Sequence, residues 1–353
     1  MNIYCAEEIN RQEWNRLVLS HPQSRFYQLA EYQDVLKEVF RYKPVNLIFK
    51  DGNETIGIFP IYLVKTIFFK KLVSIPFSEY GGIFTNFMDK LDFSLIRACL
   101  KELIRKYSVQ YLEINAGLGL PQEVMQKEFF CYPFHHYAEL ELNSQEKLWE
   151  GFEYQVRKAV NKAIRSGVEC FQQTDTASIK DLFYPLYLRA NRRLNSPPLG
   201  LNYFLSCYRN LKERMKIFYA RHSKKIIAAL LGFSTDERVY IQYIVSDERQ
   251  HERRSVDLVH WEYIKWAIQN RFKFFDFGPV RYEGQSRYKL KWNANLKTYN
   301  IFYLFENSNK KCRLPVPITP LSPQIGLFKK AWKMQLPLVQ NAIGPWIRWN
   351  LAK

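Results

Sequence analysis

Apolar residues recur at helical spacing in the first half of the chain, between segments with strand patterns. Helices are predicted at residues 7–20, 30–40 and 91–107. Two apolar runs within residues 44–65 flank Asp51-Gly52-Asn53, and this turn favours a hairpin because glycine tolerates positive φ. A strand at residues 109–115 follows. These elements predict a mixed α/β unit.

The second half repeats the order of helices, consecutive strands, a helix and further strands. Helices are predicted within residues 144–166, which end at Gly167 as a C-cap, and at residues 181–193, 201–214 and 255–270. Strands are predicted at residues 169–172, 215–222, 225–234, 239–246, 272–278 and 298–306. We therefore expect an α/β (mixed α+β) fold with two similar domains, residues 1–148 and 149–308, followed by a tail, residues 309–353.

The strand at residues 272–278 ends in Asp276-Phe277-Gly278, and the sequence predicts a polar, basic loop after it. A carboxylate and a glycine at a strand end place polar groups and bare backbone where open sheets bind ligands. The same tripeptide also occurs as an ordinary strand-to-turn exit. Protein kinases are a poor match, because no glycine-rich loop or catalytic His-Arg-Asp segment precedes it.

Charge and composition limit the classes of ligand and partner that the chain could bind. The chain of 353 residues has 52 Lys and Arg against 34 Asp and Glu, a net charge of +18. This favours a polyanionic partner: nucleic acid, a phosphate-bearing substrate or an anionic membrane surface. Six scattered cysteines and the neighbouring His135-His136, whose side chains point to opposite faces of a strand, predict no metal site.

The two ends of the chain bear on location. The first residues lack the cationic and apolar segments of a signal peptide, and no apolar run reaches about 18 residues, so we expect a cytosolic protein. Residues 309–353 contain eight Lys or Arg, no acid and three tryptophans. This tail is predicted to form two short helices and to contact a membrane surface peripherally or to pack on the first domain.

Several segments in their order and spacing resemble one family over nearly the whole chain. They are HPQSRFYQ (21–28), YQVRKAVNKAIRSG (154–167), RRLNSPP (192–198) and FDFGPVRYEGQSRYKLKW (275–292). Together they resemble the FemAB-like branch of the GNAT acyltransferase superfamily, which includes aminoacyl transferases that build peptidoglycan bridges and relatives associated with exopolysaccharide machinery.

The resemblance implies a pair of GNAT-like domains and transfer of an acyl or aminoacyl group from an activated carrier to an amine. It implies no tightly bound cofactor. The donor co-substrate would be anionic, an aminoacyl-tRNA or an acyl-CoA, and the acceptor a lipid-linked or nucleotide-linked precursor. One segment departs from the CoA-using pattern: residues 247–255, DERQHERRS, have no glycine where a pyrophosphate would approach backbone N–H groups. This favours a bulkier donor such as an aminoacyl-tRNA.

Acyl transfer to an amine needs a route for the amine proton and donors facing the developing oxyanion. The predicted catalytic residues are Asp276, Lys289 and Tyr243. Asp276 would orient the amine or accept its proton, and the direction of Tyr243 depends on strand register. The predicted substrate-binding residues are Arg157, Asn161, Arg193, Gly278, Arg281, Trp292, Glu79 and Tyr80. The basic helix face around Arg157 and the arginines near Arg193 also have structural interpretations, as a solvated face and as partners of a helix dipole.

We therefore expect an acyltransferase that acts on an amino group of a cell-envelope or exopolysaccharide precursor. Two alternatives stay open at this point. One is a CoA-dependent N-acetyl- or N-acyltransferase, and the other is a non-catalytic protein that binds RNA or a membrane surface.

Overall fold

The computed structural model describes residues 1–6, 9–67, 69–116, 129–306, 328 and 330–351. The chain forms two compact units, each described here by itself. The first contains the described residues of Met1–His135, Thr298–Pro317 and Trp349–Lys353, and the second those of His136–Lys297 and Ile318–Arg348. The boundary expected between residues 148 and 149 falls inside helix α5 (Gln145–Gly151).

The first unit has two sets of strands. An antiparallel sheet consists, in spatial order, of β1 (Asn2–Ala6), β3 (Asn46–Asp51), β4 (Glu54–Phe59) and β7 (Phe84–Thr85). A second run consists of β15 (Asn295–Phe305), β8 (Tyr111–Ala116), β6 (Lys70–Ser74), β5 (Tyr62–Lys65) and β2 (Lys43–Pro44). Strands β6 and β8 pair in parallel, so the unit is mixed as predicted.

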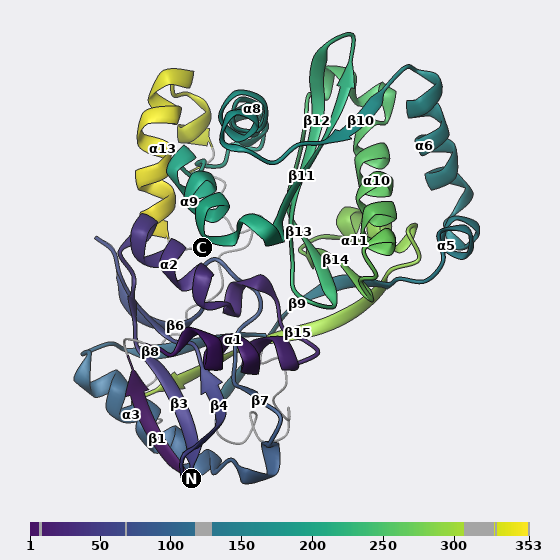
Figure 1. Ribbon diagram of the computed structural model, residues 1–353. Helices are drawn as coiled ribbons and strands as arrows, with labels where there is room; N and C mark the ends of the chain where they lie inside the picture. The colour runs from purple at the N-terminus through teal and green to yellow at the C-terminus, as the bar shows by residue number, and fades with distance from the viewer. Residues whose placement is uncertain (7–8, 68, 117–128, 307–327, 329, 352–353) are drawn as a thin grey trace. The chain divides into compact units, whose positions relative to one another are not determined.

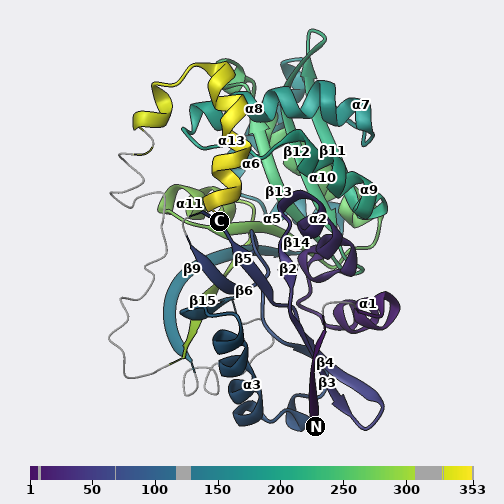
Figure 2. The same cartoon turned by 90° about the vertical axis from the view of Figure 1, so that its left-hand side faces the viewer.

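The predicted hairpin is confirmed, because β3 and β4 pair in antiparallel register around Gly52, whose φ is +58°. The α-helices of this unit are α1 (Arg11–Ser20), α2 (Ala30–Phe40) and α3 (Phe93–Lys106), and 3₁₀ turns lie at Phe26–Gln28 and Met88–Lys90. Helix α1 begins later than predicted because the Asn10 side chain accepts the N–H of Glu13 and caps the helix there. Helix α3, visible in Figure 2, contributes Ile96, Leu100 and Ile104 to the core.

The second unit contains a six-strand run. In spatial order its strands are β10 (Glu169–Gln172), β11 (Met215–His222), β12 (Lys225–Ser234), β13 (Arg238–Ser246), β14 (Phe274–Val280) and β9 (Phe130–Glu141). Neighbours are antiparallel except β13 and β14, which are parallel.

Helices cover both faces of this sheet. Its α-helices after α5 are α6 (Tyr154–Arg165), α7 (Thr176–Ser178), α8 (Tyr184–Arg193), α9 (Leu201–Leu211), α10 (Ser255–Gln269), α11 (Glu283–Leu290) and α13 (Pro337–Leu351), with Trp349–Leu351 in the first unit. A π-helical segment at Ile179–Phe183 and 3₁₀ turns at Lys212–Arg214 and Glu248–Arg253 complete the unit. Helices α8 and α9 lie on one face, and α10, against which α6 packs, lies on the other (Figure 1).

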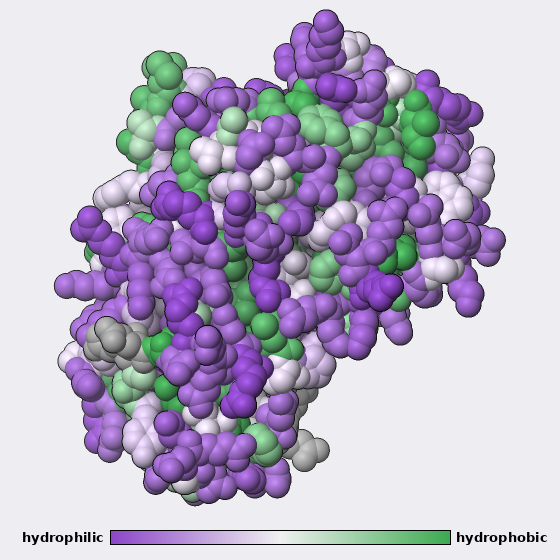
Figure 3. Space-filling model, in the orientation of Figure 1, coloured by the Kyte–Doolittle hydropathy of each residue, from purple (hydrophilic) through white to green (hydrophobic). Residues whose placement is uncertain are grey.

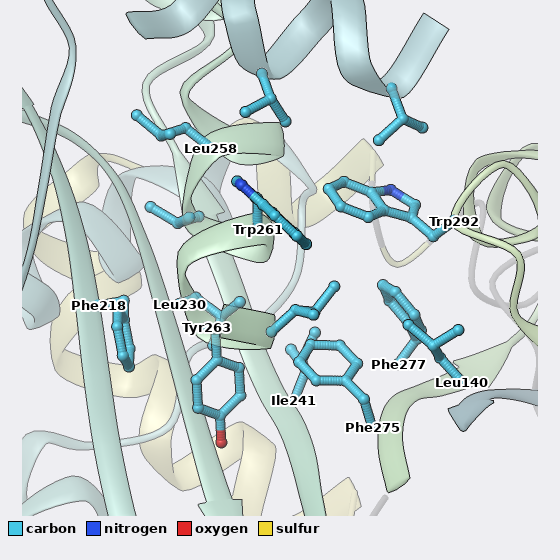
Figure 4. Packing of buried hydrophobic residues seen from close by; sticks show 14 of the residues in the cluster. Leu140, Phe218, Leu230, Ile241, Leu258, Trp261, Tyr263, Phe275, Phe277 and Trp292 are labelled. Atoms are coloured by element: carbon cyan, nitrogen blue, oxygen red, sulfur yellow. The ribbon is translucent and has the colours of Figure 1, made fainter. Parts of the chain in front are cut away.

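The core of the second unit lies between β12 to β14 and helices α6 and α10. Trp261 and Trp292 pack above Phe275 and Phe277 in Figure 4. The helix predicted within residues 144–166 is interrupted, because Phe152 has an extended backbone and is buried in this core. The loop predicted after Gly278 is partly wrong, since α11 forms there.

The tail is helical at residues 328 and 330–333 and in α13. In the second unit, α13 packs closely on the loop after α8: a Cβ added to Gly344 would lie 2.4 Å from Pro198 Cδ. In the first unit, the indole N–H of Trp349 donates to the Phe40 carbonyl oxygen at 3.1 Å. No helix among the described residues is both long enough and apolar enough to cross a bilayer.

Candidate active site

Strands β13 and β14 separate part-way along their length. Their pairing runs from Arg238 opposite Phe274 to Tyr240 opposite Asp276, and both strands continue beyond this point without pairing to each other within the fully described stretch 238–280. Parallel strands that diverge leave backbone N–H and C=O groups without ladder partners, and such groups are strong hydrogen-bonding sites. We call this place the β13–β14 split.

A bulge lies on each side of the split. In β13, Tyr243 pairs with Leu231 and Ile241 pairs with Gly232, so Gln242 is the extra residue. In β14, Asp276 pairs with Glu139 and Pro279 pairs with Tyr137, so two residues, Phe277 and Gly278, lie opposite the single Ala138 of β9. Gly278 has φ +74°, where a side chain would be strained. The bulges turn the backbone of both strands at the point where they part.

Asp276 and Lys289, two predicted catalytic residues, hold the β14 bulge. Asp276 is fully buried, and its Oδ1 accepts the Gly278 N–H at 2.7 Å. The ammonium of Lys289, on α11, donates to the carbonyl oxygens of Phe277, Gly278 and Pro279 at 2.7, 2.8 and 2.8 Å. The structure therefore brings Asp276, Gly278 and Lys289 together at the split.

Tyr243 lies on the face of the sheet covered by α8 and α9. Its ring packs edge-on against Tyr187 and Phe204, with ring centroids 5.4 and 5.5 Å away. Burial raises the pKa of Tyr243, and the positive charge of Arg348 on α13 opposes that shift. Its phenol is therefore protonated at neutral pH.

Residues 151–290 match the family model described as "Acetyltransferase (GNAT) domain". The chain contains a GNAT domain. This domain holds the β13–β14 split, and it indicates an acyltransferase, as predicted. A comparison of the sequence with curated proteins finds no match.

Solved structures share the fold across both units. The chain is similar to FemX, with 14% identity and a TM-score of 0.70 over 86% of this chain and 97% of FemX. It is similar to a tandem GNAT protein from the clavulanic acid biosynthesis pathway, with 9% identity and a TM-score of 0.57 over 87% and 98% of the two chains. It is also similar to the C-terminal domain of a putative lysylphosphatidylglycerol synthetase from Agrobacterium fabrum, with 10% identity and a TM-score of 0.56 over 84% of this chain and 91% of that one. The expected fold class and the FemAB-like GNAT resemblance are confirmed at the level of the fold.

A buried polar cluster in the GNAT domain was not predicted from the sequence. The Tyr288 hydroxyl donates to Asp257 Oδ1 at 3.2 Å and lies 3.3 Å from His260 Nδ1, which donates to the Val256 carbonyl oxygen at 2.8 Å. Burial raises the pKa of Asp257. Burial and, to a smaller extent, the Lys289 ammonium lower the pKa of His260 to about 4, although the hydrogen bond to Val256 opposes this shift. A signal was present in the sequence: Asp257 and His260 are three residues apart and alternate with the apolar residues of the first turns of α10.

His260 makes acid destabilise the fold. Below pH about 6.5 the unfolded imidazole binds a proton, whereas the folded one stays neutral down to its pKa of about 4. Unfolding therefore takes up a proton in this window, and stability is lost as the pH falls through it. In urea unfolding from pH 7 to 4, we expect His260→Gln to remove a slope of up to about 1.4 kcal/mol per pH unit. The less buried His222→Gln is the control, and an unchanged slope in His260→Gln contradicts the assignment.

Other predicted binding residues of the GNAT domain have structural contacts or lie elsewhere. Arg157 Nη1 donates to the carbonyl oxygens of Trp149, Glu150 and Phe152, at 3.3, 2.8 and 2.6 Å, and so caps the end of α5. Asn161 is exposed on α6. Trp292, just beyond this domain, is fully buried in the core, which corrects its prediction as a substrate-binding residue.

Two predicted arginines are exposed in the GNAT domain. Arg193 ends α8, with its Nε 3.9 Å from Glu248 Oε2. Arg281 precedes α11, and its backbone N–H donates to Gln285 Oε1 at 2.9 Å. Their guanidinium groups remain predicted substrate contacts.

Glu79 and Tyr80 belong to the first unit. Tyr80 is fully buried, and the Arg25 guanidinium lies 4.7 Å from its ring centroid. Its carbonyl oxygen accepts a hydrogen bond from the Gln28 side chain. Tyr80 thus joins the packed HPQSRFYQ segment, and Glu79 beside it is half-buried.

Among the described residues, no group of three or more His, Cys, Asp and Glu side chains is arranged to hold a metal ion.

Proposed function

We propose that the GNAT domain transfers an aminoacyl or acyl group from an activated carrier to an amino group of a cell-envelope or exopolysaccharide precursor. The β13–β14 split carries this proposal, because backbone freed from ladder pairing lies there beside Gly278 in a domain that matches the GNAT family. FemX and a putative lysylphosphatidylglycerol synthetase among the structures of similar fold support the aminoacyl form.

The chemistry needs placement more than a nucleophile. An amine attacks the activated carbonyl, the oxyanion is stabilised by hydrogen-bond donors, and the amine proton must leave. Backbone N–H groups near Gln242 and the protonated phenol of Tyr243 are the candidate donors in the GNAT domain. Tyr243, Asp276 and Lys289 stay predicted catalytic residues, the last two through the bulge that they hold.

The turn before α10 favours an aminoacyl-tRNA donor. Arg254, the N-cap of α10, has a left-handed conformation with φ 55°, and its N–H donates to the His251 carbonyl oxygen at 3.1 Å. The Arg253 side chain donates to Gln250 Oε1 at 2.7 Å. Long side chains thus stand where a CoA pyrophosphate would need close approach to helix N–H groups. Arginine suits phosphodiester contacts to a larger donor instead.

A CoA-dependent N-acyltransferase is the second candidate. The description of the matching family as an acetyltransferase domain favours it. The two readings differ in the donor and share the site.

For the acceptor, we propose a lipid-linked or nucleotide-linked precursor, with peripheral membrane contact through the tail. Large apolar side chains of the tail are highly exposed: Met334 by 84%, Leu336 by 70% and Leu338 by 82%. The end of α13 away from the C-terminus lies at the upper left of Figure 1, and this area is apolar in Figure 3. Exposed apolar side chains near lysines and without acids suit an anionic bilayer surface.

The donor is tested by supplying a labelled aminoacyl-tRNA mixture or acetyl-CoA to the purified protein together with a lipid-linked amine precursor. We expect label to move from the aminoacyl-tRNA to the amine. Transfer from acetyl-CoA alone, with thermal stabilisation by CoA, would establish the second candidate. Absence of transfer from both donors would overturn the proposed function.

A further inference from the structure

A surface hollow of about 450 Å³ lies along α6 of the GNAT domain. Trp149, Tyr154 and Ile164 form its apolar part, and three cationic residues also line it, Arg157, Lys158 and Arg165. None of its lining residues is acidic. The hollow therefore offers apolar surface and positive charge together.

Its aromatic part is exposed and supported from below. The Tyr154 side chain is 67% exposed, although a large ring gains from burial. Trp149 is fixed by Trp261, whose ring centroid is 5.0 Å away. A solvent-facing ring beside a fixed indole is the arrangement on which an unstacked base can pack.

Two cations of the hollow, Lys158 and Arg165, lack an acidic partner among the described residues. Lys158 and Arg165 are exposed and form no ion pair with any described carboxylate, and Lys158 Nζ lies 6.0 Å from the Tyr154 ring centroid. Arg157 differs, because its hydrogen bonds to three carbonyl oxygens hold α6 against the end of α5. Arg157 thus shapes the wall, while Lys158 and Arg165 stay available to phosphates.

We propose that this hollow binds the phosphodiester backbone and one unstacked base of an RNA strand, and that it holds the tRNA part of the donor. This rests on the proposed function. An acidic peptide would use the cations without the ring, and a flat bilayer does not fill a hollow. RNA uses both, and its backbone complements a protein of net charge +18.

The test measures the binding of a fluorescently labelled tRNA without an attached amino acid, by fluorescence anisotropy over a series of salt concentrations. We expect Lys158→Glu and Arg165→Glu each to weaken binding about tenfold and to reduce the salt slope by about 0.7–0.9 for each lost phosphate contact. Lys162→Glu is the matched control, because Lys162 is exposed on the same helix but does not line the hollow. It should change affinity less than about threefold.

The ring is tested separately from the charge. Tyr154→Ala should weaken tRNA binding about tenfold, and Tyr154→Phe should retain it, since base stacking needs the ring and not the hydroxyl. Equal losses for the glutamate variants at residues 158, 162 and 165 would overturn the site, because long-range charge would then explain them. Unchanged binding in Tyr154→Ala, or a loss confined to anionic vesicles, would also overturn it. Thermal unfolding of each variant identifies any that fails to fold. The tRNA affinities of the folded variants are then compared with those of Tyr154→Phe and Lys162→Glu.

The inference and the proposed function fail in different ways. If the hollow variants bind tRNA and transfer from aminoacyl-tRNA as the wild type does, the hollow is wrong and the function stands. If these variants lose tRNA binding while the wild type transfers from neither aminoacyl-tRNA nor acetyl-CoA, the hollow stands as an RNA-binding site and the proposed function is wrong.

Discussion

Replacing Lys289 with methionine is expected to lower the free energy of unfolding by about 3 kcal/mol or more and the rate of transfer by at least about 100-fold. The ammonium of Lys289 donates to three carbonyl oxygens of the β14 bulge, two of them in buried hydrogen bonds and one in a part-buried one, and methionine fills similar space without a donor. Each hydrogen bond to a charged group contributes about 1.5–3 kcal/mol, and the acceptors would be left unpaired. A shift of about 1 Å at a reacting centre alone costs about 100-fold.

Urea unfolding and the labelled-donor assay measure these two effects. Lys291→Met is the matched control, because Lys291 lies two residues away and makes an exposed hydrogen bond to Gln155. It should change stability by less than about 0.5 kcal/mol. If Lys289→Met loses transfer while its stability is unchanged, Lys289 takes part in the chemistry directly and the bulge does not depend on it.

Two substitutions of Asp276 are expected to separate its role in shaping the β14 bulge from the role of its negative charge. Asp276→Ala removes the acceptor of the Gly278 N–H, and leaving that group unpaired costs about 1–3 kcal/mol. The left-handed conformation of Gly278 would then no longer be fixed by this hydrogen bond, and we expect the rate of transfer to fall about 100-fold. Asp276→Asn keeps an oxygen in the same place, so its transfer rate should stay within about tenfold of the wild type.

The asparagine variant decides how Asp276 acts. The carboxylate is fully buried, which favours a positioning role over direct proton transfer. The KM and kcat of both variants should be measured with stability as the folding control. A loss in Asp276→Asn as large as that in Asp276→Ala, with stability retained, would instead support Asp276 as the base.

Elements with strong local patterns could be predicted from the sequence. Helix α2 lies at Ala30–Phe40 as expected, because its apolar side chains recur at helical spacing. The β3–β4 hairpin follows from the turn preference of Gly52. In the second half, strands β11 to β14 and helix α10 follow the predicted order, because each is a long apolar run between turn signals.

Helix α11 shows where local pattern was insufficient. Residues Glu283–Leu290 are polar, and Leu290 is 45% exposed, so no apolar stripe marks the helix. Lys289 ties it to β14 through contacts with residues ten to twelve positions earlier. Such tertiary contacts do not appear in a hydrophobic pattern, and the segment was predicted as a loop.

The candidate site was predicted in part. Asp276, Gly278 and Lys289 meet as the sequence order suggested, but the contacts of Arg157 and the burial of Trp292 depend on side-chain directions set by packing. The direction of Tyr243 depends on the extra residue Gln242, which shifts the strand register. A bulge of this kind has no sequence signal in VYIQYIVS.

The pairing of β15 with β8 affects how the protein folds during its synthesis on the ribosome. Phe305 pairs with Tyr111, so the first unit lacks this strand until after the strands of the second have been synthesised. Until then β8 has an unpaired edge, which is a template for pairing with another chain. During translation, the yield of folded protein should therefore depend more on chaperones that cover this nascent edge than on the stability of either finished unit.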